Sequence, residues 1–520
     1  MTHLPVAKAP ARARHFASRP AMSVFTPLPL GQRIPASLHA VSCSLPTMND
    51  VRGYERKDPA VTRHMTSGYP RFVVHPLLRQ LAAELVREQE LGDHTLWLTS
   101  SAAMAHRLAV HLGAAQVERV SAHGVHGIAH PPSPELAARA KVFLQNVGGF
   151  LSSRAAEDEL VRRQVLAAPA PEEVFSGDAP AEIRQQLLPA FPGVIASDLL
   201  LANCGMNAVD AAFRAITELQ AAHGRTVWIQ LGWLYLDTIA ILQKFTRTPG
   251  DYVHVRDVFD LAGLEKILAA HTGRVAGIVA ELPTNPLIQT PNVAAIAALA
   301  RQHGARVVLD PSIASAFNLT ILPHADVVVS SLTKYAANNG DLTAGLVVVN
   351  PAASDAHLLR RLIAEKIEPA YPRDLARLAL EIGRAPAVLA RMHASVPKVV
   401  AFLEKHPAVR EVFWALHPAS RQNYRQIARA PDAVGGMITF TLRGSLDQFY
   451  DRLRLPKGPS FGMETTLICP FMYLAHFDLV STDAGRAELS AGGLDPDLLR
   501  LSIGTEPVDD IIATLAEALG

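Results

Sequence analysis

The chain has 520 residues, of which 49% are hydrophobic and 19% are charged, and its formal net charge is only +1. This length is ample for a large core and for two folded lobes, and the near-neutral charge gives no reason to expect binding of nucleic acid or of an anionic membrane. No uncharged apolar run approaches the length needed to span a membrane. The three cysteines (Cys43, Cys204 and Cys469) are too few and too scattered for a disulfide framework, which favours a reducing compartment.

The first 49 residues contain no Asp or Glu but several Arg, Ser, Ala and Pro, a composition shared with transit peptides. The alternatives are a disordered extension, or a start codon placed ahead of Met22. Because the prolines would break an amphipathic helix, we favour a disordered extension over residues 1–27 and a cytoplasmic location. Residues 28–76 are rich in motifs but lack long periodicity, and they predict an arm that packs on another surface.

The arm contains Tyr69-Pro70-Arg71. An arginine can bind a phosphate group through two parallel hydrogen bonds. One interpretation is therefore that Arg71 binds a phosphate group. The alternative is that Tyr69-Pro70-Arg71 forms a turn with an exposed arginine.

Residues 77–184 predict a mixed segment with helices over 76–89, 102–112 and 134–144, a strand over 95–99 and a helix start at Ser152. His123, His126 and His130 lie together in a glycine-containing stretch. Without neighbouring Cys or carboxylate residues they favour a solvated loop over a zinc site, and no metal site is predicted.

From about residue 185 strands and helices alternate, as in βαβ units. Strands are expected over 226–230, 252–255 and 275–282, with helices over 257–270 and 293–303. Asn203 to Asn207 open a helix that runs to about residue 223, and the free backbone N–H groups of this glycine turn can bind an anion at the helix N-terminus.

Residues 306–350 predict three short, continuously apolar strands, at 306–310, 327–331 and 344–350, in a parallel sheet buried on both faces. Ligands of such sheets bind beyond the carboxyl ends of the strands, so Asp310 and Lys334 should face one crevice. A lysine can bind the aldehyde of pyridoxal phosphate, and a carboxylate can pair with its pyridine nitrogen. Ser331 and Thr333 could donate hydrogen bonds to the phosphate. The alternative is that Asp310 caps a turn and Lys334 is a surface lysine.

The remaining chain predicts helices over 357–367, 373–392 and 396–406. A smaller α+β lobe follows, with strands over 409–414 and 435–442.

The run Ser331-Leu332-Thr333-Lys334-Tyr335 resembles the lysine motif of the Cys/Met-metabolism family of pyridoxal-phosphate enzymes. The resemblance covers roughly residues 30–80 and 185–520, and it is greatest to the long, fungal-type cystathionine γ-synthases. Other matching motifs are Tyr69-Pro70-Arg71, Glu281 to Pro286, Gly435-Gly436-Met437 and Leu498 to Glu506. The chain departs from the family where Leu236 and Asp237 replace two glycines after Tyr235, and where Thr465 replaces a glutamate.

The resemblance implies an α/β protein of fold type I, whose large domain holds a mainly parallel seven-stranded sheet and whose small C-terminal domain is α+β. The implied division is an arm (28–76), an insert (77–184), a cofactor-binding domain (185–365) and a small domain (366–520). It also implies shared active sites in a homodimer or homotetramer, with Tyr69 and Arg71 reaching the phosphate of the neighbouring subunit.

The resemblance further assigns roles to single residues. Lys334 binds the cofactor and moves protons, Tyr235 stacks on the pyridine ring and takes part in proton transfer, and Asp310 pairs with the pyridine nitrogen. The backbone N–H groups of Gly205 and Met206 hold the phosphate. Arg500, Asn285 and Ser460 lie on the substrate side, where Arg500 binds the α-carboxylate and Asn285 reaches either this carboxylate or the 3′-oxygen of the cofactor.

The implied reaction is γ-replacement, in which cysteine displaces the acyl group of an O-acylhomoserine and forms cystathionine for methionine biosynthesis. The same motifs also fit a γ-lyase or an O-acylhomoserine sulfhydrylase. A rival of another class is a degenerate, non-catalytic scaffold, which would account for the altered motifs. The expected partners are small amino acids, with no nucleic acid and no membrane.

Overall fold

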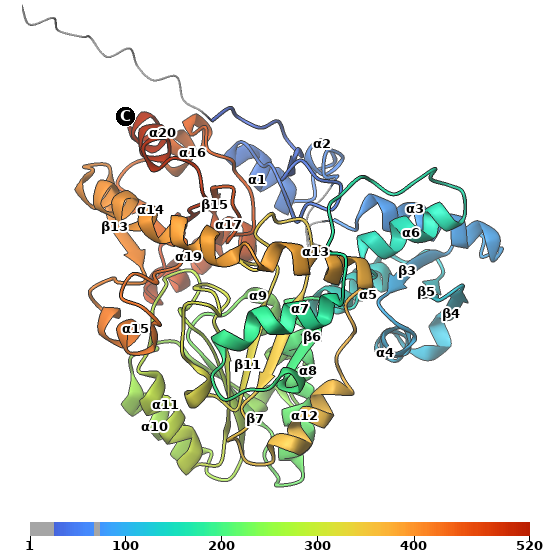
Figure 1. Ribbon diagram of the computed structural model, residues 1–520, viewed down its shortest axis with the longest axis horizontal. Coiled ribbons are helices and arrows are strands. Elements are labelled where there is room, and N and C mark those ends of the chain that lie inside the picture. Colours follow the sequence, from blue (N-terminus) through green and yellow to red (C-terminus); the bar gives the residue numbers. More distant parts are fainter. Residues whose placement is uncertain (1–24, 67–72) are drawn as a thin grey trace, which may run out of the picture.

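A seven-stranded sheet forms the centre of the molecule. The computed structural model describes residues 25–66 and 73–520, and Figure 1 shows the sheet in the lower half of the view. The strand order is β6-β12-β11-β10-β9-β7-β8. The bounds are β6 Leu199–Ala202, β7 Val227–Leu231, β8 Tyr252–Val255, β9 Val275–Glu281, β10 Arg306–Asp310, β11 Val327–Ser331 and β12 Gly345–Val349.

The sheet is mainly parallel, as predicted, but one strand runs in the opposite direction. β12 pairs antiparallel with both β11 and β6, whereas the pairs formed by β7 to β11 are parallel. The prediction that residues 344–350 continue the parallel arrangement is therefore wrong. A parallel connection needs a crossover, usually through a helix, and the segment between β11 and β12 contains no helix.

Helices cover both faces of this sheet, which explains why its strands are continuously apolar. Neighbouring residues of one strand enter different cores: Ile278 packs with helices α10 and α11, and Val279 packs with α8, α9 and α12. The bounds are α8 Gly205–Ala221, α9 Leu236–Phe245, α10 Leu261–Ala270, α11 Val293–Gln302 and α12 Ala356–Ala364.

The C-terminal part forms a second, antiparallel sheet of four strands in the order β13-β14-β16-β15. Its strands are β13 Val409–Trp414, β14 Met437–Leu442, β15 Leu467–Pro470 and β16 Leu499–Ser502. Its helices are α13 Pro372–Ile382, α14 Ala385–Lys405, α15 Arg421–Ile427, α16 Leu446–Arg452, α17 Phe471–Ala475, α18 Phe477–Val480, α19 Asp483–Ala491 and α20 Val508–Leu519. One hydrophobic core joins this part to the arm and to one face of the large sheet, so the boundary at residue 365 stays a prediction.

The predicted helix boundaries in this part are wrong. The chain breaks at Gly383, between α13 and α14, and α14 continues through Pro397. The proline removes one backbone hydrogen bond, but Val396, Val399 and Val400 are buried on either side of it. Tertiary packing of these side chains keeps the helix continuous.

The insert is a third layered unit with its own hydrophobic core, drawn at the right of Figure 1. Its antiparallel sheet has the order β3-β5-β4. Its elements are α3 Pro76–Glu88, β3 Thr95–Thr99, α4 Ala102–Leu112, β4 Glu118–Ala122, β5 Val125–His130, α5 Pro134–Val147 and α6 Ser153–Arg162. Helix α7 Ala179–Leu187, which follows, belongs to the core of the large sheet and packs against α13. The predicted helices, the strand over 95–99 and the helix start at Ser152 are confirmed.

The predicted loop around the three histidines is wrong, because this stretch is a β-hairpin. His123 and Gly124 form a two-residue turn, both with positive φ (51° and 83°), which matches the twist of paired strands. His126 and His130 belong to β5. His130 is fully buried and accepts a hydrogen bond from the Trp97 indole at 3.1 Å, so it has a packing role.

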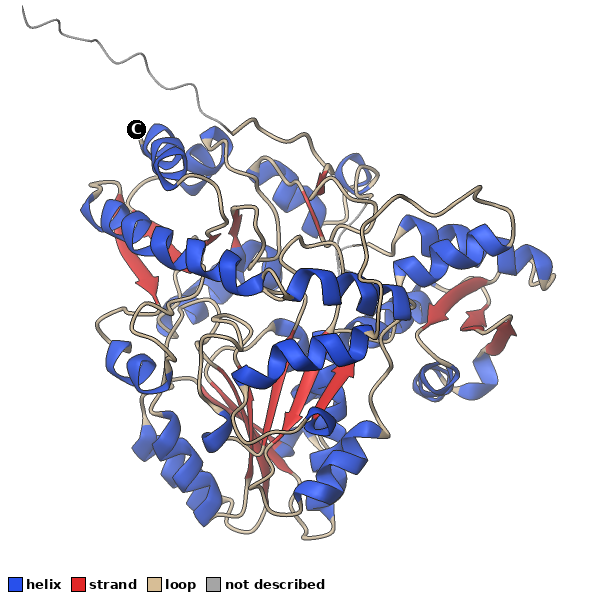
Figure 2. Cartoon of the chain, viewed as in Figure 1, coloured by secondary structure: helices blue, strands red, loops and turns tan. Residues whose placement is uncertain are grey.

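The arm packs on the C-terminal part of the same chain (Figure 2). It contains strands β1 Arg33–Ile34 and β2 Ser42–Cys43 and helices α1 Met48–Glu55 and α2 Pro59–Thr62. Arg52 binds Asp447 through two hydrogen bonds of 2.7 and 2.8 Å, and Tyr450 donates to the Leu45 carbonyl. Within the described residues, no helix is both long and apolar enough to cross a membrane.

Candidate active site

A cavity of about 230 Å³ opens where the carboxyl ends of β10 and β11, the N-terminus of α8, the insert and the C-terminal sheet meet. The ten predicted site residues that the structure describes all line it: Gly205, Met206, Tyr235, Asn285, Asp310, Ser331, Thr333, Lys334, Ser460 and Arg500. The two remaining predicted residues, Tyr69 and Arg71, lie outside the described residues.

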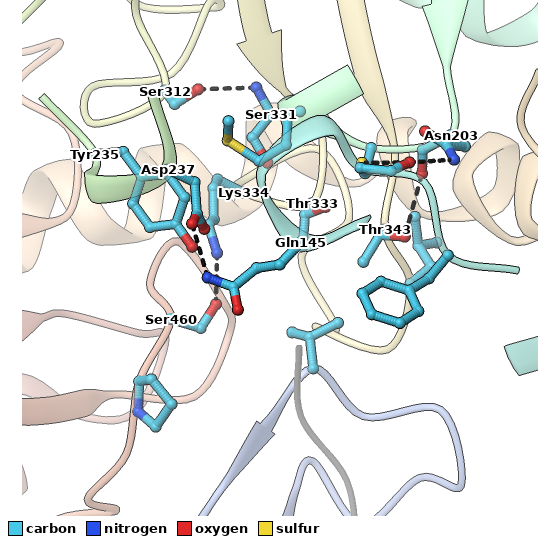
Figure 3. Close-up of a pocket in the computed structure, with 18 of the residues that line it drawn as sticks. Gln145, Asn203, Tyr235, Asp237, Ser312, Ser331, Thr333, Lys334, Thr343 and Ser460 are labelled. Carbon is cyan, nitrogen blue, oxygen red and sulfur yellow. Dashed lines mark hydrogen bonds between the residues drawn. The ribbon is translucent and has the colours of Figure 1, made fainter. Parts of the chain in front are cut away.

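Lys334 follows β11 and reaches into the cavity (Figure 3). Its Nζ donates a hydrogen bond to Ser460 Oγ at 2.8 Å and lies 4.8 Å from the centre of the Phe461 ring. Burial, and then the nearby Arg500 charge, hold the pKa of Lys334 well below its usual value. This shift favours the neutral form of the amine, which is the form that acts as a nucleophile or a proton acceptor.

Asp310 and Glu281 end two neighbouring parallel strands and pair in register. Burial raises the pKa of Asp310 to about 6, although the N–H and hydroxyl of Ser312 both donate to its Oδ1, at 2.8 and 2.5 Å. Burial, and then the charge of Asp310, raise the pKa of Glu281 well above normal, and Glu281 accepts a hydrogen bond from the Tyr235 backbone N–H. The two carboxyl groups form a buried acidic pair that a positive group would stabilise.

The N-terminus of α8 lies close to the end of β11. A Cβ on Gly205 would come within 2.8 Å of the Ser331 Cβ, so only glycine fits this approach. The Thr333 hydroxyl is already engaged by the Ala344 backbone, accepting from its N–H at 3.1 Å. The N–H groups of the first turn of α8 can donate to an anion, as at other helix N-termini.

Arg500 lies on β16 between two aromatic rings. Its guanidinium carbon is 4.6 Å from the Phe471 ring centre and 5.1 Å from that of Phe461. It donates to Asn285 Oδ1 at 3.2 Å and to the Ser460 carbonyl at 3.4 Å. These contacts fix the planar fork, which can bind a carboxylate with two hydrogen bonds.

The donor set fits pyridoxal phosphate. Lys334 offers a neutral amine for the aldehyde, and the buried Asp310 offers a carboxyl group for the pyridine nitrogen. Gly205 and Met206 offer backbone donors for the phosphate. Burial shifts the pKa values of Lys334 and Asp310, and the start of α8 provides the backbone donors.

Two residues that sequence reasoning missed also line the cavity. Asp237, which replaces a family glycine, accepts hydrogen bonds on Oδ1 from Gln145 Nε2 at 2.7 Å and from Asn146 Nδ2 at 2.8 Å. Gln145 and Asn146 belong to α5 of the insert, and Gln145 reaches the cavity. Nothing local in the sequence marks this contact, because the partners are about ninety residues apart. The one signal in the sequence was that Asp237 stands where the family has a glycine.

The comparisons with known proteins agree with this geometry. The family described as Cys/Met metabolism PLP-dependent enzyme matches residues 194–520. The L-2-amino-4-chloropent-4-enoate dechlorinase/desaturase of Streptantibioticus cattleyicolor is 40% identical to this chain, over 93% of this chain and 97% of that protein. The cystathionine gamma-synthase of Neurospora crassa is 26% identical, over 95% and 98%.

A solved structure is similar in fold. Cystathionine gamma synthase from Xanthomonas oryzae pv. oryzae, in complex with cystathionine, has a TM-score of 0.56 and 22% identity, over 70% of this chain and 96% of that chain. This likeness supports the fold alone. The family match and the 40% identity show that the chain is an enzyme of the Cys/Met metabolism family, with fold type I and a requirement for pyridoxal phosphate.

Proposed function

We propose that this enzyme eliminates a leaving group from the γ-carbon of an L-2-amino acid, with a halide as the first candidate. The observation that carries the proposal is the 40% identity to the dechlorinase/desaturase, whose named substrate bears chlorine on carbon 4, the γ-carbon. The match extends over 93% of this chain and therefore includes most of the insert as well as both other parts.

The site residues have roles that suit such a reaction. Arg500 binds the α-carboxylate, which orients the substrate against Lys334. Nζ of Lys334, whose pKa is lowered by burial, accepts the proton from Cα, and Ser460 holds this amine in place. Bound pyridoxal phosphate supplies the electron sink for charge that develops along the substrate. The leaving group departs with its electron pair and the carbon skeleton loses one proton, so the product is the substrate minus HX.

Among the residues that the structure describes, the charges around the cavity favour elimination over replacement. Replacement with cysteine would bring a second α-carboxylate into the site. Among the described residues that line the cavity, the cationic side chains are Lys334, Arg500 and Arg154. Arg154 is already held by Glu172 and Asp374 at 2.7 and 3.0 Å. Of these three, Arg500 alone has a fork placed for a carboxylate.

A second candidate is γ-replacement, in which an O-acylhomoserine and cysteine give cystathionine in transsulfuration and methionine biosynthesis. The observation that favours it is the 26% identity to the Neurospora cystathionine gamma-synthase over nearly the full length of both chains. The shared family motifs suit both reactions.

One set of assays separates the candidates. Purified holoenzyme is incubated with L-2-amino-4-chloropent-4-enoate and with O-acetyl-, O-succinyl- and O-phospho-L-homoserine, each with and without cysteine or sulfide. Elimination predicts chloride release and a product lighter by HCl, at a rate independent of cysteine. Replacement predicts cystathionine only when cysteine is present. Lack of turnover under every condition would overturn both candidate reactions.

A further inference from the structure

Gln145 brings a polar side chain from the insert into the active-site cavity. It lies in the last turn of α5 and lines the cavity together with Lys334, Tyr235 and Ser460. Figure 3 shows its side chain extending across the cavity toward Asp237, with the amide group near the end of Lys334. Leu144, Phe150 and Leu151 of the same segment line the cavity with apolar side chains, and the polar Ser152, Ser153 and Arg154 follow them.

The orientation of this amide is fixed by its partner. Gln145 Nε2 donates to Asp237 Oδ1 at 2.7 Å. A carboxylate oxygen needs a donor, so the nitrogen must face Asp237 and the carbonyl oxygen Oε1 must face away from it. In Figure 3 this oxygen points into the cavity. The insert thus presents a hydrogen-bond acceptor at a defined place.

The backbone that carries Gln145 is also fixed. Asn203 donates to the Gly148 carbonyl at 2.9 Å, and Asn207 donates to the Val147 carbonyl at 3.4 Å. A Cβ on Gly148 would lie 2.3 Å from Cys204 Sγ. The end of α5 is therefore seated against the first turn of α8, and Gln145 cannot shift without moving the anion-binding turn.

We propose that Gln145 is a specificity-determining residue that contacts the side chain of the amino-acid substrate beyond Cβ. This inference rests on the proposed function, in which an L-2-amino acid with a γ-substituent occupies the cavity. Arg500 and Lys334 fix the carboxylate and Cα, so the side chain extends along the remaining lining. Gln145 Oε1 is a hydrogen-bond acceptor next to the lining contributed by Leu144, Phe150 and Leu151, and it distinguishes side chains that donate a hydrogen bond beyond Cβ from side chains that do not.

The test compares two amino acids that bind without a good leaving group, L-homoserine and L-norvaline. Their side chains have the same number of heavy atoms, but the terminal group of homoserine is a hydroxyl donor. Binding to the holoenzyme is followed by the absorption change of the bound cofactor. In Gln145→Leu the ratio of the dissociation constants, homoserine over norvaline, should rise about tenfold, because a buried hydroxyl loses its acceptor.

The matched control is Gln116→Leu, because Gln116 is an exposed glutamine of the same insert and does not line the cavity. Its ratio should equal that of the wild type. Gln145→Met, which keeps the length of the side chain and removes the acceptor, should reproduce the change seen in Gln145→Leu and serves if the leucine variant folds poorly.

An unchanged ratio in a folded, cofactor-loaded Gln145 variant would overturn the proposal. Loss of cofactor by both variants, with their circular dichroism unchanged, would also overturn the proposal. Gln145 would then support the cofactor site and would not contact the substrate. Neither measurement needs turnover. Failure of every turnover assay would therefore refute the proposed elimination without changing this result.

Discussion

At the scale of single residues, the environment of Asp310 makes the stability of the cofactor-free protein depend on pH. Burial raises the pKa of this carboxyl group to about 6, so between about pH 4 and pH 6 the native state holds a proton that the unfolded state has lost. The native state binds more protons in this window, and stability therefore falls as pH rises through it.

Asp310→Asn should remove this dependence. The free energy of unfolding of the apoenzyme, measured in urea, should fall by about 2 kcal/mol more in the wild type than in the variant between pH 4 and pH 7. Part of this difference comes from Glu281, because the charge of Asp310 raises the pKa of that carboxyl group and the variant lacks this charge. If the free energy of unfolding changed equally with pH in the two proteins, the pKa of Asp310 would not be raised in the native state.

Lys334 should carry the cofactor covalently. Its neutral amine lies in the same cavity as Asp310 and the α8 N-terminus. Borohydride reduction of the holoenzyme, followed by peptide mapping, should place the pyridoxyl label on the peptide that contains Lys334. Lys457 is a useful internal control, because burial also lowers its pKa, to about 8, yet it lies outside the cavity and should carry no label.

At the scale of elements, the junction between α5 and α8 should control how well the cofactor is held. Gly148 has a φ of +67°, and a Cβ there would lie 2.7 Å from the Asn207 backbone nitrogen. Gly148→Ala must displace backbone in the anion-binding turn, so we expect a loss of about 3 kcal/mol in stability and weaker binding of pyridoxal phosphate.

Gly92 offers the matched control for this substitution. It is in the same insert and has a similar φ of +63°, but nothing lies within 4 Å of its added Cβ. Gly92→Ala should cost only the backbone strain of about 1 kcal/mol and leave cofactor affinity unchanged. Equal effects of the two substitutions, in urea unfolding and in cofactor titration, would exclude a special role for the junction.

At the scale of the whole molecule, a buried ionic cluster connects the insert to the rest of the chain. Arg154 on α6 is fully buried and binds Glu172, the Asp374 carboxylate on α13 and the Asp341 carbonyl, at 2.7, 3.0 and 2.9 Å. Removing one partner from a buried ion pair leaves the other charge uncompensated.

Arg154→Met should lower the free energy of unfolding by about 3–5 kcal/mol. Arg139, which is partly exposed and lies 3.8 Å from Glu135 on the same insert, provides the comparison. Arg139→Met should change stability by less than about 1 kcal/mol. A small effect at Arg154 would mean that the insert is held mainly by its apolar contacts.

We also expect the active unit to be at least a dimer with shared sites. This prediction comes from the resemblance of Tyr69-Pro70-Arg71, which lies outside the described residues. Arg71→Ala and Lys334→Ala homodimers should each be nearly inactive. A mixed dimer would contain one doubly damaged site and one intact site, so it should have about half of the wild-type activity, and an equal mixture, in which about half of the dimers are mixed, should recover about a quarter. Heterodimers that form but stay inactive would show that the arm serves its own chain.

Sequence reasoning located the strands around Asp310 and Lys334 because short apolar runs followed by polar residues are a local signal. Ten residues that it predicted for the site line one cavity, because strand ends and motifs fix which groups meet there. It failed where a distant partner decides the outcome. The direction of β12 depends on how a loop returns, the continuity of α14 depends on buried valines around Pro397, and the contact of Gln145 with Asp237 depends on how the insert docks.

The ion pairs of Arg154 make the presence of the insert hard to reverse in evolution. Asp341 and Asp374 lie outside the insert, yet both have the Arg154 guanidinium within 4 Å. A descendant that deleted the insert in one event would keep these carboxylates in a buried place without that cation, and Asp237 would lose its two amide donors. Asp341, Asp374 and Asp237 would have to be substituted before the deletion. While the insert is present, each of these substitutions would destabilise the protein. Each contact between the insert and the rest of the chain therefore adds to the stability that would be lost with the insert.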